Sequence, residues 1–139
     1  MKWLATKFEL DSLIKDAQER IKEFRQTIVD CDRKIARLES VYRELGNLKS
    51  DFRNARKNTE EIFEMKTVWQ GERHTAFQRA GSALDDSYGS YYARLDDAQD
   101  AVNRRIGELR AQKLKLLPRI DGLLLQINQW TIEIANILN

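Results

Sequence analysis

The residues with side chains reactive enough for catalysis or metal binding are few in this 139-residue chain, which has one histidine and one cysteine. His74 lies between Arg73 and Thr75 with no cysteine nearby, so we interpret it as a surface residue and not as a general base or a ligand. Cys31 occupies an apolar position of a repeat described below, which favours a small buried hydrophobe over a reactive thiol. A single cysteine excludes an internal disulfide, and together the two residues cannot make the usual zinc sites.

The acidic and glycine residues also supply no reaction centre. The pairs Asp85–Asp86 and Asp96–Asp97 resemble metal ligands at first sight. Adjacent residues on a helix point about 100° apart, however, and no Glu-x-x-His motif accompanies them. The glycines form no phosphate-binding loop. We therefore expect no catalytic, cofactor-binding or metal-binding residue, no cofactor, and a protein that is not an enzyme.

Composition favours long helices and excludes several classes of protein. One proline and six glycines leave little material for turns, while 33% of the residues are charged and 42% hydrophobic. Lys and Arg total 24 against 22 Asp and Glu, a balance that indicates neither nucleic acid nor an anionic membrane as partner. No apolar run approaches the ~18 residues of a membrane span. Lys7, Glu9 and Asp11 interrupt the N-terminal segment, so we expect no conventional signal peptide.

A seven-residue repeat organises the first half of the chain. Alternating steps of three and four keep apolar residues on one helix face, which is typical of a coiled coil. Lys49 is the only polar residue on this seam, which otherwise consists of Ile14, Ala17, Ile21, Phe24, Ile28, Cys31, Ile35, Leu38, Tyr42, Leu45 and Phe52. The pattern weakens over residues 54–61, where Asn58 and Glu61 have the spacing of a capping box. We expect the helix to fray there or a new short helix to begin.

The repeat returns at Leu84 and continues to Ile137, with Lys113 as its only polar position. Two consecutive steps of four, from Ala98 to Val102 and on to Ile106, form a stutter that locally unwinds a supercoil. Pro118 lies inside the pattern, and an interior proline costs roughly 3 kcal/mol. We expect a kink there, or a restart with Pro118 in the first turn of a new helix.

Beyond Pro118 the apolar face is wider than a seam between two helices requires. The N-terminal residues Trp3, Leu4 and Phe8 are one cover for it, and a partner protein is the other. Both readings stay open at this point. In the second reading, the partner-binding face consists of Leu117, Leu124, Leu125, Trp130, Ile132 and Leu138.

The two repeats flank Trp69-Gln-Gly71 at the middle of the chain. Glycine is the residue best able to reverse a helix, and the tryptophan can cover the apolar end of a hairpin. We therefore predict an all-α fold, a long antiparallel helical hairpin like a coiled coil, as one elongated domain over residues 1–139. Its arms cover about 8–66 and 73–138, with the turn at 67–72. Paired residue numbers should sum to about 140, as in Phe52–Tyr88, Leu38–Val102 and Phe24–Leu116, with local offsets near the stutter and the proline.

Trp69 and Gly71 between two heptad arms resemble the central motif of the WXG (ESAT-6-like) superfamily of type VII secretion. The long arms, the aliphatic residue before the motif and Phe77 make the chain more similar to the YwqH-like small helical proteins. Those proteins accompany LXG toxins of Gram-positive bacteria. The resemblance covers nearly the whole chain and implies a targeting factor that binds the helical LXG domain of a toxin, often with a second small helical protein.

The resemblance also implies that the joint bundle is presented to the secretion ATPase. Tyr92 and Asp96 match the Tyr-x-x-x-Asp/Glu export signal of such substrates, and their spacing beside the seam predicts that they face outward. We expect a cytoplasmic protein, or one co-secreted with its toxin, that self-associates when alone and binds neither nucleic acid nor membranes. Two other functions remain open: a structural coiled-coil tether, and a helical-hairpin chaperone unconnected with secretion.

Overall fold

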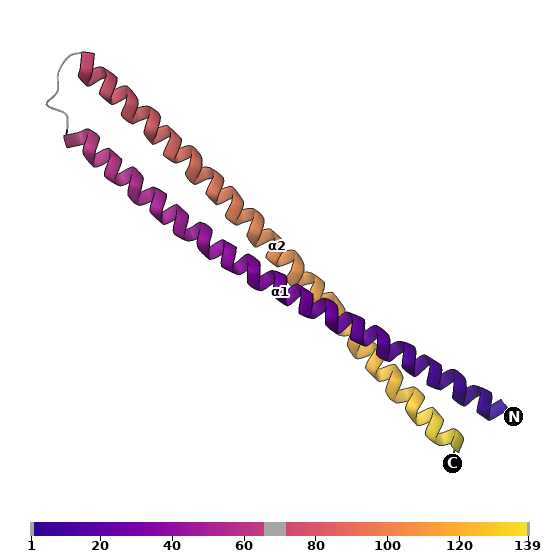
Figure 1. Cartoon of the computed structure of the whole chain (residues 1–139). Helices are drawn as coiled ribbons and strands as arrows, with labels where there is room; N and C mark the ends of the chain where they lie inside the picture. Colours follow the sequence, from indigo (N-terminus) through magenta and orange to yellow (C-terminus); the bar gives the residue numbers. More distant parts are fainter. Residues whose placement is uncertain (1, 66–71, 139) are drawn as a thin grey trace. The chain divides into compact units, whose positions relative to one another are not determined.

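The computed structural model describes residues 2–65 and 72–138, and their side chains over 6–62 and 75–138 (Figure 1). Helix α1 comprises Lys2–Met65 and helix α2 comprises Glu72–Leu138. The two helices pack against each other, which confirms the prediction of an all-α helical hairpin. The predicted turn, with Trp69 and Gly71, lies outside the described residues except for Glu72 at the start of α2.

Helix α1 is continuous through residues 54–61, so the expectation of fraying or of a new helix at Asn58 is wrong. The segment contains several strong helix formers, namely Ala55, Arg56, Lys57, Glu60 and Glu61, and side-chain contacts also link its successive turns. Arg56 pairs with Glu60 one turn later at 3.6 Å, and the Thr59 hydroxyl donates to the carbonyl of Ala55 at 2.9 Å. A weak apolar pattern therefore indicates a solvated stretch of helix here and not its end.

Helix α2 continues through Pro118, so the expected restart is also wrong. Proline has no N–H and leaves the carbonyl of Leu114 without its helical donor. Leu114 is 66% exposed, so water has access to that part of the helix. Leu116 and Ile120, on either side of the proline, are both buried. Their packing against α1 holds the helix where propensity alone would end it.

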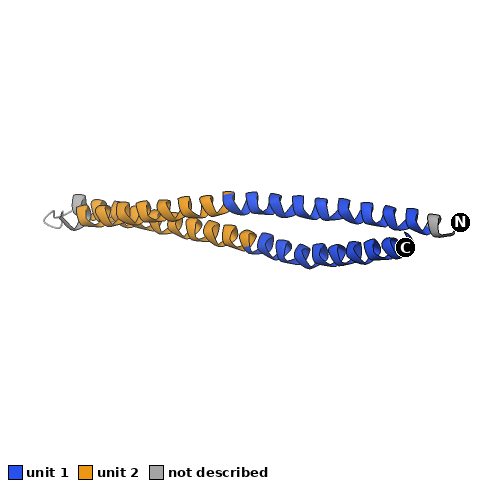
Figure 2. Ribbon diagram, turned by 90° about the horizontal axis from the view of Figure 1, so that it is seen from below, with its two compact units in different colours: residues 1–36, 107–139 blue, residues 37–106 orange. Residues whose placement is uncertain are grey.

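The chain divides into two compact units, each containing a piece of both helices (Figure 2). Unit 1 comprises residues 1–36 and 107–139, and unit 2 comprises residues 37–106. Among the described side chains, nearly all the buried apolar ones belong to unit 1: Leu10, Ala17, Ile21, Cys31, Ile35, Leu109, Leu116 and Ile120. The prediction that Cys31 is a buried hydrophobe is confirmed. Unit 1 therefore contains the hydrophobic core.

Unit 2 is held together differently, because Ile106 is the one buried residue among its described seam positions, and the others are half-buried or, like Tyr42, Leu84 and Tyr91, exposed. The ring of Phe52 meets that of Tyr88 edge-on, with centroids 6.1 Å apart, as the pairing rule predicts. It also stacks on Tyr91 at 5.7 Å. Aromatic contacts and polar pairs between the helices therefore replace the aliphatic core of unit 1.

Candidate interaction surfaces

The predicted partner-binding face lies in unit 1. Five of its six members are exposed: Leu117 (47%), Leu124 (42%), Leu125 (67%), Ile132 (53%) and Leu138 (58%). At 100° per residue these five lie within less than half of the circumference of α2. The same arc includes Leu114, which sequence reasoning missed although it lies one turn before Leu117. We call these six residues, Leu114, Leu117, Leu124, Leu125, Ile132 and Leu138, the α2 apolar face.

Trp130 does not belong to this face. It is half-buried, and its position on the helix is on the side opposite Leu117. In the first of the two readings left open above, Phe8 helps to cover the apolar surface, but it is itself 69% exposed. The side chains of Trp3 and Leu4 lie outside the described residues.

A groove between α1 and α2 of unit 1 adjoins the α2 apolar face. It has a volume of about 500 Å³, and we call it the Leu124 groove. Its apolar lining combines the buried Ile21 with Val29, Leu124 and Ile127, and two of these side chains, Val29 and Leu124, are each 42% exposed. Its polar lining consists of Lys22, Arg25, Gln18 and Gln26. An apolar floor with a basic rim is suited to binding an amphipathic helix.

The basic residues of this groove are functional candidates that sequence reasoning missed. The sequence pattern assigns Lys22 and Arg25 to a solvated outer face, because a heptad repeat does not distinguish one charged residue beside the seam from another. Their position one residue after a seam residue, Ile21 or Phe24, does not distinguish them, because Asp32 also follows a seam residue; only the structure places both in the lining of the groove.

A second, smaller groove of unit 1 has a volume of about 310 Å³ and is lined by Arg20, Phe24, Arg119, Gly122, Leu123 and Gln126. On α1, Arg20 lies about 160° or more around the helix from Lys22 and Val29 of the Leu124 groove, at 100° per residue. The Arg20 guanidinium lies over the Phe24 ring, 6.0 Å from its centroid.

Tyr92 and Asp96 do not face outward, so that part of the sequence interpretation is wrong. Both are half-buried, whereas Tyr91, expected on the seam, is 52% exposed. Arg53 of α1 donates to the Tyr92 hydroxyl at 2.5 Å, and the Lys49 ammonium lies 5.0 Å from the centre of the Tyr92 ring. Lys49 also forms an ion pair with Asp96. Helix α1 therefore contacts both residues of the candidate export signal.

The polar break at Lys49 has a structural explanation in this contact. Besides Asp96, its ammonium donates to Gln99 Oε1 at 3.0 Å, and Gln99 Nε2 donates in turn to the Tyr42 carbonyl at 3.2 Å. Gly46 provides the space, because a Cβ at that position would lie 3.3 Å from the Gln99 amide nitrogen. The hydrogen bond to Asp96 raises the pKa of Lys49 above its ordinary value.

The polar break in the second arm is matched in the same way in unit 1, where Lys113 forms an ion pair with Asp32. This pair departs from the pairing rule by more than one helical turn, in the region where the stutter and the proline lead us to expect an offset. Each seam lysine thus meets a carboxylate of the other helix. A polar residue at a seam position stabilises one register over others, because a shifted alignment would leave the charge against apolar side chains.

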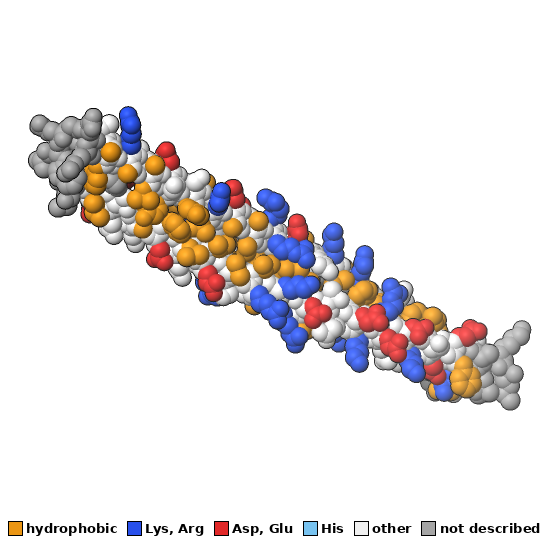
Figure 3. Space-filling model, turned by 45° about the horizontal axis from the view of Figure 1, so that its top comes forward, with side chains coloured by type: hydrophobic (Ala, Val, Ile, Leu, Met, Phe, Trp, Pro, Cys, Tyr) orange, Lys and Arg blue, Asp and Glu red, His pale blue; other side chains and the backbone are white. Residues whose placement is uncertain are grey.

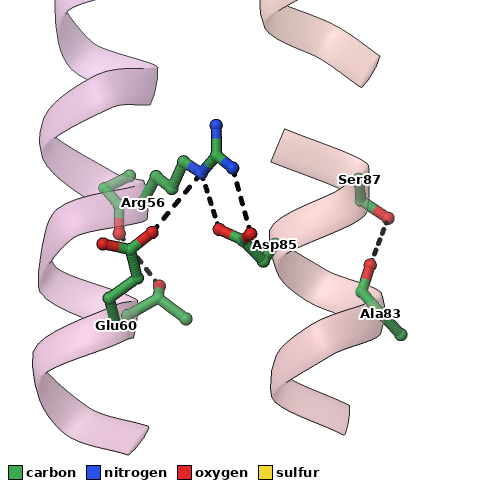
Figure 4. Close-up of polar contacts among 7 residues, drawn as sticks. Arg56, Glu60, Ala83, Asp85 and Ser87 are labelled. Atoms are coloured by element: carbon green, nitrogen blue, oxygen red, sulfur yellow. Dashed lines mark hydrogen bonds and ion pairs between the residues drawn. The ribbon is translucent and has the colours of Figure 1, made fainter. Parts of the chain in front are cut away.

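A bidentate ion pair between Arg56 of α1 and Asp85 of α2 joins the helices in unit 2 (Figure 4). Arg56 Nε and Nη2 donate to the two carboxylate oxygens of Asp85 at 2.6 and 3.0 Å. These hydrogen bonds hold the pKa of Asp85 below its ordinary value and raise that of Arg56. Asp85 of the acid pair Asp85–Asp86 is therefore a structural ion-pair partner. Among the side chains described over 6–62 and 75–138, no group of three or more acidic, His or Cys residues is arranged to hold a metal ion.

Unit 2 also exposes large apolar side chains, namely Val41, Tyr42, Leu48, Ile62, Leu84 and Tyr91. Figure 3 shows apolar side chains gathered where α1 ends and α2 begins, and charged side chains of both signs over the rest of that face. Within the described residues, neither helix has a segment long and apolar enough to cross a membrane.

Comparison with known proteins adds no assignment: no family model matches the chain, and no curated protein or solved structure matches it either.

The Arg56–Asp85 bridge makes a testable prediction about acid. Because the folded state lowers the Asp85 pKa, it binds the Asp85 proton less readily than the unfolded chain does. The bridge therefore contributes fully above the ordinary Asp value of 3.8, and its contribution is lost as pH falls through the lowered value. We expect the protection of unit 2 amides from hydrogen exchange, measured relative to their intrinsic exchange rates, to fall as pH drops below 3.8. The fall should be larger in the wild type than in Asp85→Asn. An equal fall in both proteins would contradict the assignment.

Proposed function

We propose that this protein is a targeting factor of type VII secretion, which binds the helical LXG domain of a toxin and helps to present it for export. The observation that carries the proposal is the α2 apolar face. Its six aliphatic side chains are between 42% and 67% exposed on one side of one helix. Isolated soluble proteins rarely leave such a surface uncovered, and a second helical protein would bury it as one more layer of a bundle.

The other parts of the molecule have roles in the same proposal. The exposed apolar side chains of unit 2 offer a place for a second small helical protein. The secretion ATPase would recognise the bundle through Trp69 and Gly71, or through Tyr92 and Asp96. Because Lys49 and Arg53 of α1 contact Tyr92, recognition of that side chain by the ATPase would require these contacts to break. Without a partner, the exposed faces would lead to self-association.

Co-expression with an LXG domain encoded beside this protein tests the proposal. We expect a complex that survives gel filtration, and at least a hundredfold weaker binding when Leu117→Asp and Leu124→Asp are combined, because each aspartate would be buried unpaired at the interface. Leu48→Asp is the matched control, since Leu48 is 45% exposed but lies in unit 2. It should leave LXG binding nearly unchanged.

Two outcomes would contradict the proposal. A discrete homodimer that ignores the LXG domain would favour the structural tether. Weak binding of many unfolded proteins, with no preference for the LXG domain, would favour the helical-hairpin chaperone. If Leu48→Asp instead of the Leu117/Leu124 variant abolished the complex, the toxin would bind unit 2 and the second helical protein would take unit 1.

A further inference from the structure

We propose that the Leu124 groove binds an acidic amphipathic helix, with apolar side chains inserted between Val29 and Leu124 and with carboxylates paired to Lys22 and Arg25. The chemistry of the groove supports this inference by itself. The identity of the protein that carries the helix rests on the proposed function.

The shape of the groove fits one helix. Its α1 side is formed by Gln18, Lys22, Arg25 and Val29, which recur at helical spacing over about 16 Å of the axis. A helix of about three turns has the same length. At the bottom, Ile21 is 4% exposed, while Val29 and Leu124 stand at the walls with 42% of their surface accessible. These walls gain burial only when another apolar side chain enters between them.

The charge of the groove indicates which helix fits. Its lining contains two cations, two amides and no carboxylate. Lys22 and Arg25 are exposed at the rim, where ion pairs add little affinity but discriminate strongly between partners, because like charges brought together there repel. Glutamate or aspartate beside the apolar stripe of the incoming helix is therefore favoured, and lysine or arginine is rejected.

Other occupants fit less well. A second copy of this chain has acidic residues over 85–100, of which Asp85 and Asp96 are paired with Arg56 and Lys49 in their own hairpin, and a wild-type dimer is therefore one of the outcomes of the test below. Nucleic acid would place its phosphates against the apolar side chains of Val29 and Leu124, and only Lys22 and Arg25 of the lining could pair with those phosphates. An acidic helix from a different protein satisfies both the walls and the rim.

A pair of synthetic peptides tests the inference on the full chain. The first is a labelled amphipathic helix of about four turns with leucines at i, i+4 and i+7 and glutamates at the flanks, and its twin has lysine in place of each glutamate. We expect the acidic peptide to bind at least about tenfold more tightly at low salt, and this ratio to shrink as salt rises. Combining Lys22→Glu with Arg25→Glu should reverse the preference.

The matched control is Arg33→Glu with Lys34→Glu, which makes the same charge change on exposed positions of α1 that do not line the groove. It should keep the preference for the acidic peptide. Val29→Asp should weaken binding of the acidic peptide at least tenfold while circular dichroism shows unchanged helix content. Equal binding of the twins, or acidic binding that survives the Lys22/Arg25 reversal, would overturn the inference. So would a wild-type dimer that excludes both peptides and dissociates with Val29→Asp.

The result also separates this inference from the proposed function. If the acidic peptide binds and an LXG domain neither competes with it nor co-purifies, the groove inference stands and the targeting function fails. If an LXG domain co-purifies but the twins bind alike, the targeting function stands and the groove inference fails.

Discussion

Replacing Leu109 by alanine is expected to lower the free energy of unfolding by about 3 kcal/mol, within the range of about 2 to 5 kcal/mol for removing a buried leucine side chain. Leu109 is 1% exposed, the lowest value among the described side chains of appreciable size, and it lies in the core of unit 1. Urea unfolding followed by circular dichroism measures the change. The effect should be a shift of the midpoint with little change in slope.

Leu125→Ala is the matched control for that experiment. It removes the same atoms from the same helix and the same unit, but Leu125 is 67% exposed. We expect a loss below about 0.5 kcal/mol. If the two variants lost similar stability, the core would not lie where the burial pattern places it, and Leu125 would be covered in solution by another molecule.

Replacing Pro118 by alanine is expected to have a large effect in the opposite direction. Proline inside a helix is about 3 kcal/mol less favourable than alanine, and the alanine variant regains the N–H that the carbonyl of Leu114 lacks. The more flexible unfolded chain of the variant offsets up to about 1 kcal/mol. A gain near 2 kcal/mol should therefore appear in urea unfolding of the purified protein.

Gly122→Ala provides the comparison, because a Cβ at Gly122 meets no other atom within 4 Å. Its expected gain is about 1 kcal/mol, from helix propensity alone. A Pro118→Ala variant no more stable than Gly122→Ala would mean that the proline costs little in this helix, and that the loss of its N–H is already compensated. A less stable variant would mean that the proline ring itself contributes packing.

The two stability predictions bear on partner binding as well. Leu114, Leu117 and Pro118 lie together at the start of the α2 apolar face. If proline serves only to weaken an isolated helix, Pro118→Ala should bind an LXG domain as tightly as the wild type does. The core substitution at Leu109 should weaken binding only as far as it unfolds unit 1.

Much of the fold was predictable because helix formation and heptad position are local properties. The steps of three and four assigned Ile21, Cys31 and Leu116 to one face of their helices, and all three are buried. The Phe52–Tyr88 contact follows from a reversal near mid-chain. The exposure of the α2 apolar face was largely predictable too, since a stripe wider than two helices need leaves aliphatic residues such as Leu125 and Ile132 uncovered.

The tertiary structure alone decided the rest, because contacts across the seam depend on register and on how closely the helices approach. A heptad pattern shows a lysine in the seam only as an interruption of the apolar residues and does not reveal its partner. Nothing in the heptads therefore predicted the ion pair between Lys49 and Asp96. Tyr92 looked exposed because the repeat assigned Tyr91 to the seam, but both tyrosines contact α1, Tyr91 through Phe52 and Tyr92 through Arg53. The continuity of α2 through Pro118 likewise depends on long-range packing, which offsets the cost of a proline inside a helix. The sequence alone indicates that cost but not the packing that offsets it.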